Sequence, residues 1–402
     1  MELIVVKKGV DGTYRYTIIH VRIKQREVAM YEFEAIHEFL PEEERITLSR
    51  LFAHELMGEI ALEWTELIRY AIEQGHEIAL IKIHKDDYFI GVAIVSIVRR
   101  LDWTKYLWQP VAPFFKLFGS FDVGFLEVPF SNFPGLLTVE GIDHAERGAI
   151  IDELCVYIRG TLHLDILCIK IDNTVELSDN SHCHKKLTSL TFYPNTILNY
   201  PYKSLDEFFN SLTRKKFRKC RADRRALEKY KGNVEVCHDI STVVPRVYEL
   251  YKKTSGVVKK KPHFIEMPVS IDKEFFSGLP LFNRLKPVFV LVKVNDAIIA
   301  YSLLMQSGNT LFFKAVGLDY DMSFKTKAYF NLYYATMEYA SQQKCDKIDF
   351  GVTSYHFKKW IGCKLYPTQY FCDASHPLLS LVRKQIAYFI ERSIGTLGSG
   401  PD

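Results

Sequence analysis

The sequence lacks the short motifs that define several large enzyme classes. It has no GxSxG, HExxH, Walker or Rossmann glycine pattern, which argues against α/β-hydrolases, zincins, P-loop NTPases and dinucleotide-binding enzymes. Its eight cysteines include no CxxC pair, so we expect buried free thiols in a reducing compartment. His182, Cys183 and His184 cluster, but a zinc site needs a third or fourth ligand that no nearby spacing supplies. We therefore expect no metal.

Long apolar runs and strong charge imbalance are also missing. No apolar run reaches about 18 residues, so we expect no integral membrane segment. The first residues, MELIVVKKGVDG, lack the apolar core of a signal peptide, and the expected location is cytoplasmic. The formal net charge is only +4, so any anion-binding site must be local. The 402 residues exceed what one small core holds, which predicts at least two domains.

The sequence does contain an internal repeat in its order of elements. Two apolar runs around a polar turn, 78–83 and 89–98, predict a β-hairpin, and 288–294 with 297–306 predict a second one. Each hairpin is followed by a further strand, a helix and a final strand; the helices are expected at about 144–160 and 326–343, and the final strands at 164–171 and 346–350. An antiparallel meander that leads into a β-α-β step, seen twice, predicts two similar α/β domains in tandem.

The polar stretch 171–189 suits a linker between these domains. We therefore expect an N-terminal domain over 1–190, a C-terminal domain with the active site over 191–395, and a flexible tail over 396–402.

Residues 204–231, SLDEFFNSLTRKKFRKCRADRRALEKYK, predict a basic helix. Ser204 stands three residues before Glu207, which is the capping-box pattern of a helix start. Four arginines repeat at spacings of four, three and four and so share one face of the helix: Arg214, Arg218, Arg221 and Arg225. Such a face is either solvated, paired with acidic side chains, or a binding surface for the phosphates of a nucleotide-like donor or an RNA.

The segment 311–367 carries a family resemblance. A short strand ends in Asp349-Phe350-Gly351 and is followed by Phe357-Lys358-Lys359-Trp360-Ile361-Gly362, with the arginine-rich helix upstream. This order resembles the C-terminal half of FemAB-like aminoacyltransferases and of related GNAT proteins of the peptidoglycan- and cellulose-biosynthesis type. The resemblance covers about 200–372, and more weakly 55–171. It implies tandem GNAT-like domains, each a mixed, mostly antiparallel sheet flanked by helices.

Acyl transfer to an amine needs a polarised carbonyl, a held amine and a proton donor for the leaving group. Lys358 matches the lysine of the family's FKxxFG element, and the resemblance implies that it contacts the substrate or its carbonyl. Asp349 ends a buried-looking strand and could hold the amine, orient Lys358, or merely cap the strand. Tyr320 is a candidate acid and Asp319 or Asp321 a candidate base, although a plain turn fits these residues equally well.

The loop 323–328 departs from GNAT enzymes that use coenzyme A, because it has no glycine. Those enzymes commonly cradle the cofactor's pyrophosphate with a glycine-containing loop at a helix start. Here Lys325, Thr326 and Lys327 would instead meet phosphate through their side chains, at a helix N-terminus whose dipole favours anions.

The sequence thus predicts an N-acyltransferase that takes an acyl group from a coenzyme A ester or another thioester and passes it to a small-molecule or peptide amine. Two alternatives remain open. One is aminoacyl transfer from an aminoacyl-tRNA, and the other is a non-catalytic GNAT-like binding scaffold.

Overall fold

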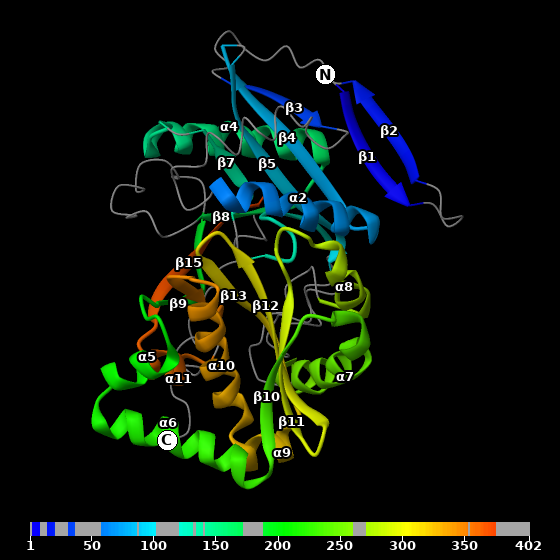
Figure 1. Cartoon of the computed structure of the whole chain (residues 1–402). Coiled ribbons are helices and arrows are strands. Elements are labelled where there is room, and N and C mark those ends of the chain that lie inside the picture. The colour runs from blue at the N-terminus through cyan, green and yellow to red at the C-terminus, as the bar shows by residue number, and fades with distance from the viewer. Residues whose placement is uncertain are drawn as a thin grey trace, which may run out of the picture. The chain divides into compact units, whose positions relative to one another are not determined.

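The computed structural model describes residues 2–8, 14–20, 31–36, 58–86, 88–101, 120–131, 134–139, 141–171, 188–259, 271–352 and 354–374. The chain divides into two compact units (Figure 1). The N-terminal unit holds the described residues up to Tyr193 and those from Pro367 onward; the C-terminal unit holds Pro194–Tyr366.

The N-terminal unit has a main sheet in the order β15-β8-β6-β5-β4-β3, with β7 beside β5 and a separate β1–β2 hairpin. β6 and β8 are parallel and the other pairs are antiparallel. Ile150, Leu154 and Ile158 of α4 are buried in one core with residues of β4, β5, β6 and β8. The elements are β1 (Glu2–Lys8), β2 (Tyr14–His20), β3 (Glu32–Ile36), α2 (Gly58–Glu73), β4 (Glu77–Lys85), β5 (Tyr88–Leu101), β6 (Phe121–Leu126), β7 (Leu136–Thr138), α4 (His144–Leu162), β8 (Ile166–Ile171) and β15 (Lys364–Ala374).

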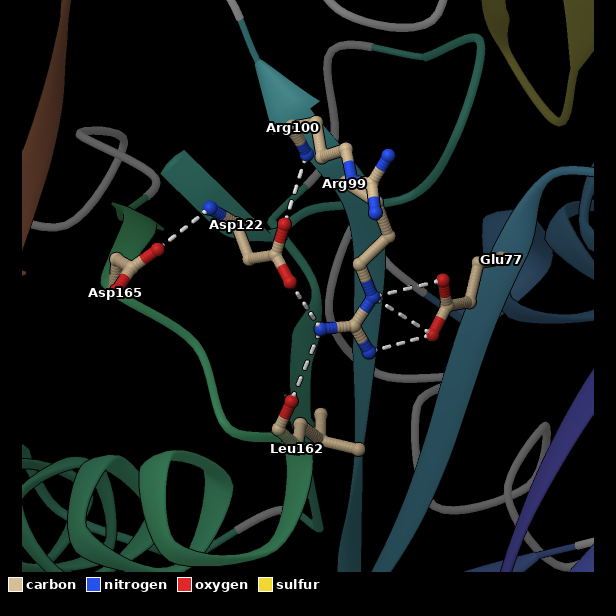
Figure 2. A network of polar contacts seen from close by, with 6 residues as sticks. All are labelled: Glu77, Arg99, Arg100, Asp122, Leu162 and Asp165. Carbon is tan, nitrogen blue, oxygen red and sulfur yellow. Dashed lines mark hydrogen bonds and ion pairs between the residues drawn. The ribbon is translucent and has the colours of Figure 1, made fainter. Parts of the chain in front are cut away.

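Arg99 joins three strands and a helix end of this unit (Figure 2). Its guanidinium donates to the Glu77 carboxylate on β4 at 2.7 Å, to Asp122 on β6 at 3.0 Å and to the Leu162 carbonyl at the end of α4 at 3.2 Å. The pKa of Asp122 lies below its ordinary value because hydrogen bonds from Arg100 and Arg99 outweigh the effect of burial, which is the largest single influence. The network fixes the ends of these elements against one another.

Replacing Arg99 by alanine should lower the free energy of unfolding of the N-terminal unit by about 2 kcal/mol, because two half-buried carboxylates lose their shared cation. Arg100→Ala is the matched control, since only the backbone amide of Arg100 takes part, donating to Asp122. A lowered folded pKa stabilises the fold above the unfolded value and loses this effect at lower pH, so the difference between wild type and Arg99→Ala should shrink below about pH 4. Chemical denaturation at pH 7 and pH 3 measures both effects, and equal losses from the two variants would contradict this account.

The C-terminal unit has a sheet in the order β10-β11-β12-β13-β14-β9. β13 and β14 run parallel, whereas β14 and β9 run antiparallel. Its elements are β9 (Thr188–Asn199), α5 (Leu205–Ser211), α6 (Arg214–Lys229), β10 (Gly232–Cys237), α7 (Ile240–Lys259), α8 (Lys273–Gly278), η3 (Leu279–Leu281), β11 (Val288–Val294), β12 (Ala297–Ser307), β13 (Thr310–Leu318), α9 (Tyr320–Thr326), α10 (Ala328–Gln342), β14 (Lys347–Asp349) and α11 (Tyr355–Ile361).

Helices cover both faces of this sheet (Figure 1). On one face, Leu332 and Met337 of α10 share a core with Leu311 of β13 and Ile348 of β14. On the other face α7 lies against β12 and β13. Gly317 permits this approach, because a Cβ at that position would lie 2.8 Å from the α7 backbone.

The predicted α/β fold with two tandem domains of similar order is confirmed: β4-β5-β6-α4-β8 corresponds to β11-β12-β13-α10-β14. Two predicted elements differ in detail. The helix expected over 204–231 is two helices, because Leu212 is extended and Thr213 is the N-cap of α6. Ser204 does cap α5, by accepting from the Glu207 amide. The helix expected over 326–343 is preceded by α9 and starts after Lys327, which has φ 56°.

The domain limits also differ from those expected. The C-terminal domain was expected over 191–395, but the C-terminal unit ends at Tyr366. Gln369–Ala374 of β15 pair with Ile166–Ile171 of β8 and so belong to the N-terminal unit. The tail expected over 396–402 lies outside the described residues. The chain therefore enters the C-terminal unit within β9 and leaves it within β15.

β13 and β14 separate at Asp349. Their parallel pairing ends at Phe312↔Asp349, whereas β13 continues to Leu318. Past this point the Leu318 amide donates to the Thr254 hydroxyl of α7 at 2.8 Å instead of to a strand. The strands thus part at the carboxyl end of β14, which is where α/β folds usually place their ligands.

Candidate active site

Asp349 occupies the point where the strands part. It pairs with Phe312 and Ile197, and alternation along the strands places its side chain on the sheet face opposite α10. The residue is 6% exposed. One carboxylate oxygen accepts from the Gly351 amide and the other from Asn195 Nδ2, each at 2.7 Å. The carboxylate is therefore held on both sides.

Burial raises the pKa of Asp349 above its ordinary value, and the bonds from Asn195 and Gly351 and the charges of Lys358 and Lys314 only partly oppose this. A carboxylate with a raised pKa accepts a proton more readily at neutral pH, which suits a general base. The strand-cap alternative for Asp349 also has support, because the carboxylate bonds the amide two residues on.

Lys358 is enclosed beneath the loop that follows Asp349. The residue is 2% exposed, and its ammonium donates to the carbonyls of Phe350 at 2.6 Å, Gly351 at 3.1 Å and Val352 at 3.0 Å. All three ammonium protons have a backbone acceptor. Because Gly351 also donates to Asp349, Lys358 fixes the loop that fixes the carboxylate.

Burial lowers the pKa of Lys358 to about 7, with Cys363 and Asp349 acting in the opposite direction. Contact between Lys358 and a substrate carbonyl stays a prediction. It requires the ammonium to exchange one of its three bonds to backbone carbonyls for a bond to the substrate. The position shown makes Lys358 a positioning residue for Asp349.

Asp319 and Tyr320 lie at the far end of β13, seven residues past Phe312 and so about 23 Å along an extended strand. Asp319 caps α9 by accepting from the Met322 amide at 3.2 Å, which matches the turn interpretation. Burial raises the pKa of Tyr320, whose hydroxyl is near that of Thr254. Within the described residues no hydrogen bond or ion pair joins Asp319 or Tyr320 to Asp349 or Lys358.

The four arginines of α6 are all exposed: Arg214, Arg218, Arg221 and Arg225. In the described part of the chain none of them forms an ion pair; the Arg221 guanidinium lies 5.5 Å from the Phe217 ring and Arg225 Nε donates to the Arg221 carbonyl. The opposite side of α6 is anchored by buried Cys220, Asp223 and Leu227. α6 therefore presents one cationic face that no carboxylate of the described ranges neutralises.

The three residues predicted to meet phosphate after β13 differ in accessibility. Lys325 is exposed, and Lys327 is half-buried with its ammonium 4.3 Å from the exposed Phe324 ring. Thr326 is fully buried and its hydroxyl donates to the Met322 carbonyl at 2.8 Å, so it is not presented to a ligand here. Side-chain contact to phosphate thus fits Lys325 and Lys327.

Asn331 brings these lysines and α6 together. Its amide nitrogen donates to the Asp223 carbonyl of α6 at 3.1 Å and to the Lys327 carbonyl at 3.0 Å. At the other end of α6, Lys216 donates to the Trp360 carbonyl of α11 and lies 5.5 Å from its ring. α6 therefore runs between the α9–α10 junction and the helix that carries Lys358.

Sequence reasoning missed Asn195, Asn331 and Asp223. Tyr334 donates to buried Asp223 at 3.1 Å, and Lys219 is ion-paired with it. Asp223 shares the apolar side of α6 with Cys220 and Leu227, and this helical spacing was a sequence signal that its carboxylate is buried. Asn195 gave none, because its role depends on the pairing of β9 with β14.

Comparison with known proteins matches residues 214–359 to the family described as acetyltransferase (GNAT) domain. Two solved structures share the fold over most of the chain. FemX has a TM-score of 0.55 at 15% identity, over 87% of this chain and 99% of that one. The tandem GNAT protein from the clavulanic acid biosynthesis pathway has a TM-score of 0.54 at 8% identity, over 86% and 99%. No curated protein matches the sequence.

The fold and the matched domain define a tandem GNAT protein, and the chain is an enzyme of the acyltransferase class. More narrowly, the match to the GNAT domain lies in the C-terminal unit, and FemX shares the fold over 87% of this chain. The matched domain gives acyl transfer as its general reaction.

In the described ranges no helix is long and apolar enough to span a membrane. The same ranges hold no group of three His, Cys, Asp or Glu residues placed to bind a metal ion, and His182 to His184 lie outside them.

Proposed function

We propose that the protein is an N-acyltransferase whose acceptor amine is held by Asp349. The observation that carries this proposal is the buried carboxylate at the parting of β13 and β14, held by Gly351 and Asn195. The amine gives up a proton as it attacks the activated carbonyl, and a carboxylate with a raised pKa can take it. Lys358 keeps the loop, and through it the carboxylate, in place.

Coenzyme A esters are the leading donor class, and the fit of this chain to their phosphates rests on side chains. Lys325 and Lys327 would hold phosphate at the start of α10, together with the arginine face of α6 to which Asn331 ties them. The ester supplies a thioester carbonyl that an amine can attack. Tyr320 stays a candidate acid on the sequence alone, because it lies past the end of β13, about 23 Å from the strand position that pairs with Asp349.

The arginine face favours one second candidate, an aminoacyl-tRNA donor. Four exposed guanidinium groups, with no carboxylate partner among the described residues, form a longer cationic surface than one pyrophosphate requires. A tRNA would place several phosphodiester groups along this surface, and its binding would therefore depend strongly on salt.

A donor screen tests the proposal. The full chain is mixed with a panel of primary amines and with acetyl-CoA, longer acyl-CoA esters or charged tRNA, and amine-dependent release of thiol or deacylated tRNA is followed. We expect turnover with one donor class and loss of that turnover in Asp349→Asn. Binding of a donor without turnover by any amine would support the non-catalytic scaffold instead.

Replacing Arg218 and Arg221 together by glutamine should raise the donor KM by about 10- to 100-fold with little change in kcat, because phosphate contacts made equally in the ground and transition states are lost. Lys229→Gln, at the exposed end of the same helix, is the control. Steady-state kinetics at 50 and 200 mM salt measure this effect. The donor KM should depend weakly on salt for a coenzyme A ester and strongly for a tRNA. An unchanged KM in the double variant would show that α6 does not bind the donor.

A further inference from the structure

Among the described residues, one polar atom of Asn195 has no hydrogen-bond partner. Its amide nitrogen faces Asp349 Oδ2 at 2.7 Å, and since a carboxylate only accepts, this fixes the orientation of the amide group. The amide oxygen, Oδ1, is then buried and has no hydrogen-bond partner in the described residues. A buried acceptor of this kind usually finds a protein donor, a water or a ligand.

The free oxygen lies beside the proposed acceptor site. Asn195 is on β9 two residues before Ile197, which pairs with Asp349, so both side chains project from the same face of the sheet. The strand is secured here, because Thr196 donates its amide to the Gly351 carbonyl at 3.1 Å and accepts from the Phe350 amide at 2.9 Å. Two acceptors, one from Asp349 and one from Asn195, therefore stand together.

We infer that Asn195 and Asp349 form a two-acceptor site that selects a primary amine as the acyl acceptor. This rests on the proposed function. A neutral primary amine has two N–H groups, one for each acceptor, and a lone pair left to attack the carbonyl. A hydroxyl has a single proton and leaves one buried acceptor unpaired. A site built to receive an N–H discriminates strongly against an analogue that lacks it.

The proton balance of the reaction fits the pair. The C–N bond forms, and the bond from the carbonyl to the thiol or hydroxyl of the donor breaks. The amine N–H that is hydrogen-bonded to Asp349 gives its proton to that carboxylate, which passes it to the leaving group. The second N–H stays on Asn195 Oδ1 and becomes the N–H of the product amide. No further reactant is required.

The test compares glycinamide with glycolamide, an amine and a hydroxyl acceptor of the same shape, in wild type and Asn195→Ala with the donor that supports turnover. Asn195→Ala removes the bond to Asp349 for both acceptors, and we expect kcat/KM for glycinamide to fall about 10- to 100-fold more than kcat/KM for glycolamide. Asn199→Ala, an exposed asparagine of the same strand, should match wild type. A purely structural role of Asn195 would lower kcat/KM equally for both acceptors. That result, or an unchanged kcat/KM for both, overturns the inference.

A second readout separates this inference from the proposed function. If wild type turns over no donor, the proposed function fails, and the inference is judged by NMR of the Asn195 side-chain amide during titration with methylammonium chloride. A saturable shift that is lost in Asp349→Asn sustains an amine site. An unmoved resonance overturns it.

Discussion

Asparagine in place of Asp349 should lower kcat by about 100-fold or more while the protein stays folded, because the change keeps the shape of the side chain and removes the proton acceptor. In the wild type, kcat/KM should rise with pH as the Asp349 carboxyl ionises, and this limb should lie above the ordinary aspartate range because burial raises the pKa. Asp349→Asn should lack the limb. The pH–rate profile of each protein measures both effects.

Asp346→Asn is the matched control, since this exposed carboxylate stands just before β14. It should leave kcat and the pH profile unchanged. Retained activity in Asp349→Asn, with the acid limb still present, would assign Asp349 to capping the strand and move the base elsewhere, with Asp319 the next candidate.

Methionine in place of Lys358 should cost about 2 kcal/mol of unfolding free energy, because the buried carbonyl of Phe350 and the part-buried carbonyl of Val352 lose their donor. Gly351 loses less, since its carbonyl also accepts from Thr196. Turnover should fall too, through the loop that orients Asp349. Denaturation curves and kcat of the same preparation measure the two losses.

The pH dependence of this loss has a definite sign. The pKa of Lys358 is about 7 in the folded protein against an ordinary lysine value of 10.5, so the unfolded chain binds more protons between these values. Wild-type stability therefore gains from this group as pH rises from 7 to about 10.5, and the gap to Lys358→Met should widen over that window. Lys359→Met, an exposed neighbour, should show neither effect. If Lys358→Met is fully stable yet inactive, direct contact with the substrate carbonyl becomes the better role.

The sequence predicted the fold well where periodicity and order carry the information. Both hairpins, both long helices and the final strands follow from alternation and helical spacing, and the repeat gave the tandem arrangement. The break between α5 and α6 was not predictable, because apolar residues continue at helical spacing through Leu212. Thr213 is the N-cap of α6, but the residue type alone does not show that the backbone leaves the helical conformation there.

The site was predictable only in part. Asp349 ends a strand and Asp319 follows one, and the sequence does not show that Asp349 is buried where two strands part while Asp319 caps a short helix. Lys358 was found by motif, but the direction of its ammonium depends on the path of the loop above it. Asn195 comes 154 residues before Asp349, and only strand register unites them.

The return of β15 to the N-terminal unit has a consequence for synthesis. Domains made first on the ribosome usually fold first. Here β8 receives its β15 partner, Gln369–Ala374, only after the whole C-terminal unit has been made, so the unit that begins the chain is finished last. A product cut off after the GNAT domain would leave β8 as an open sheet edge, which favours pairing with other chains.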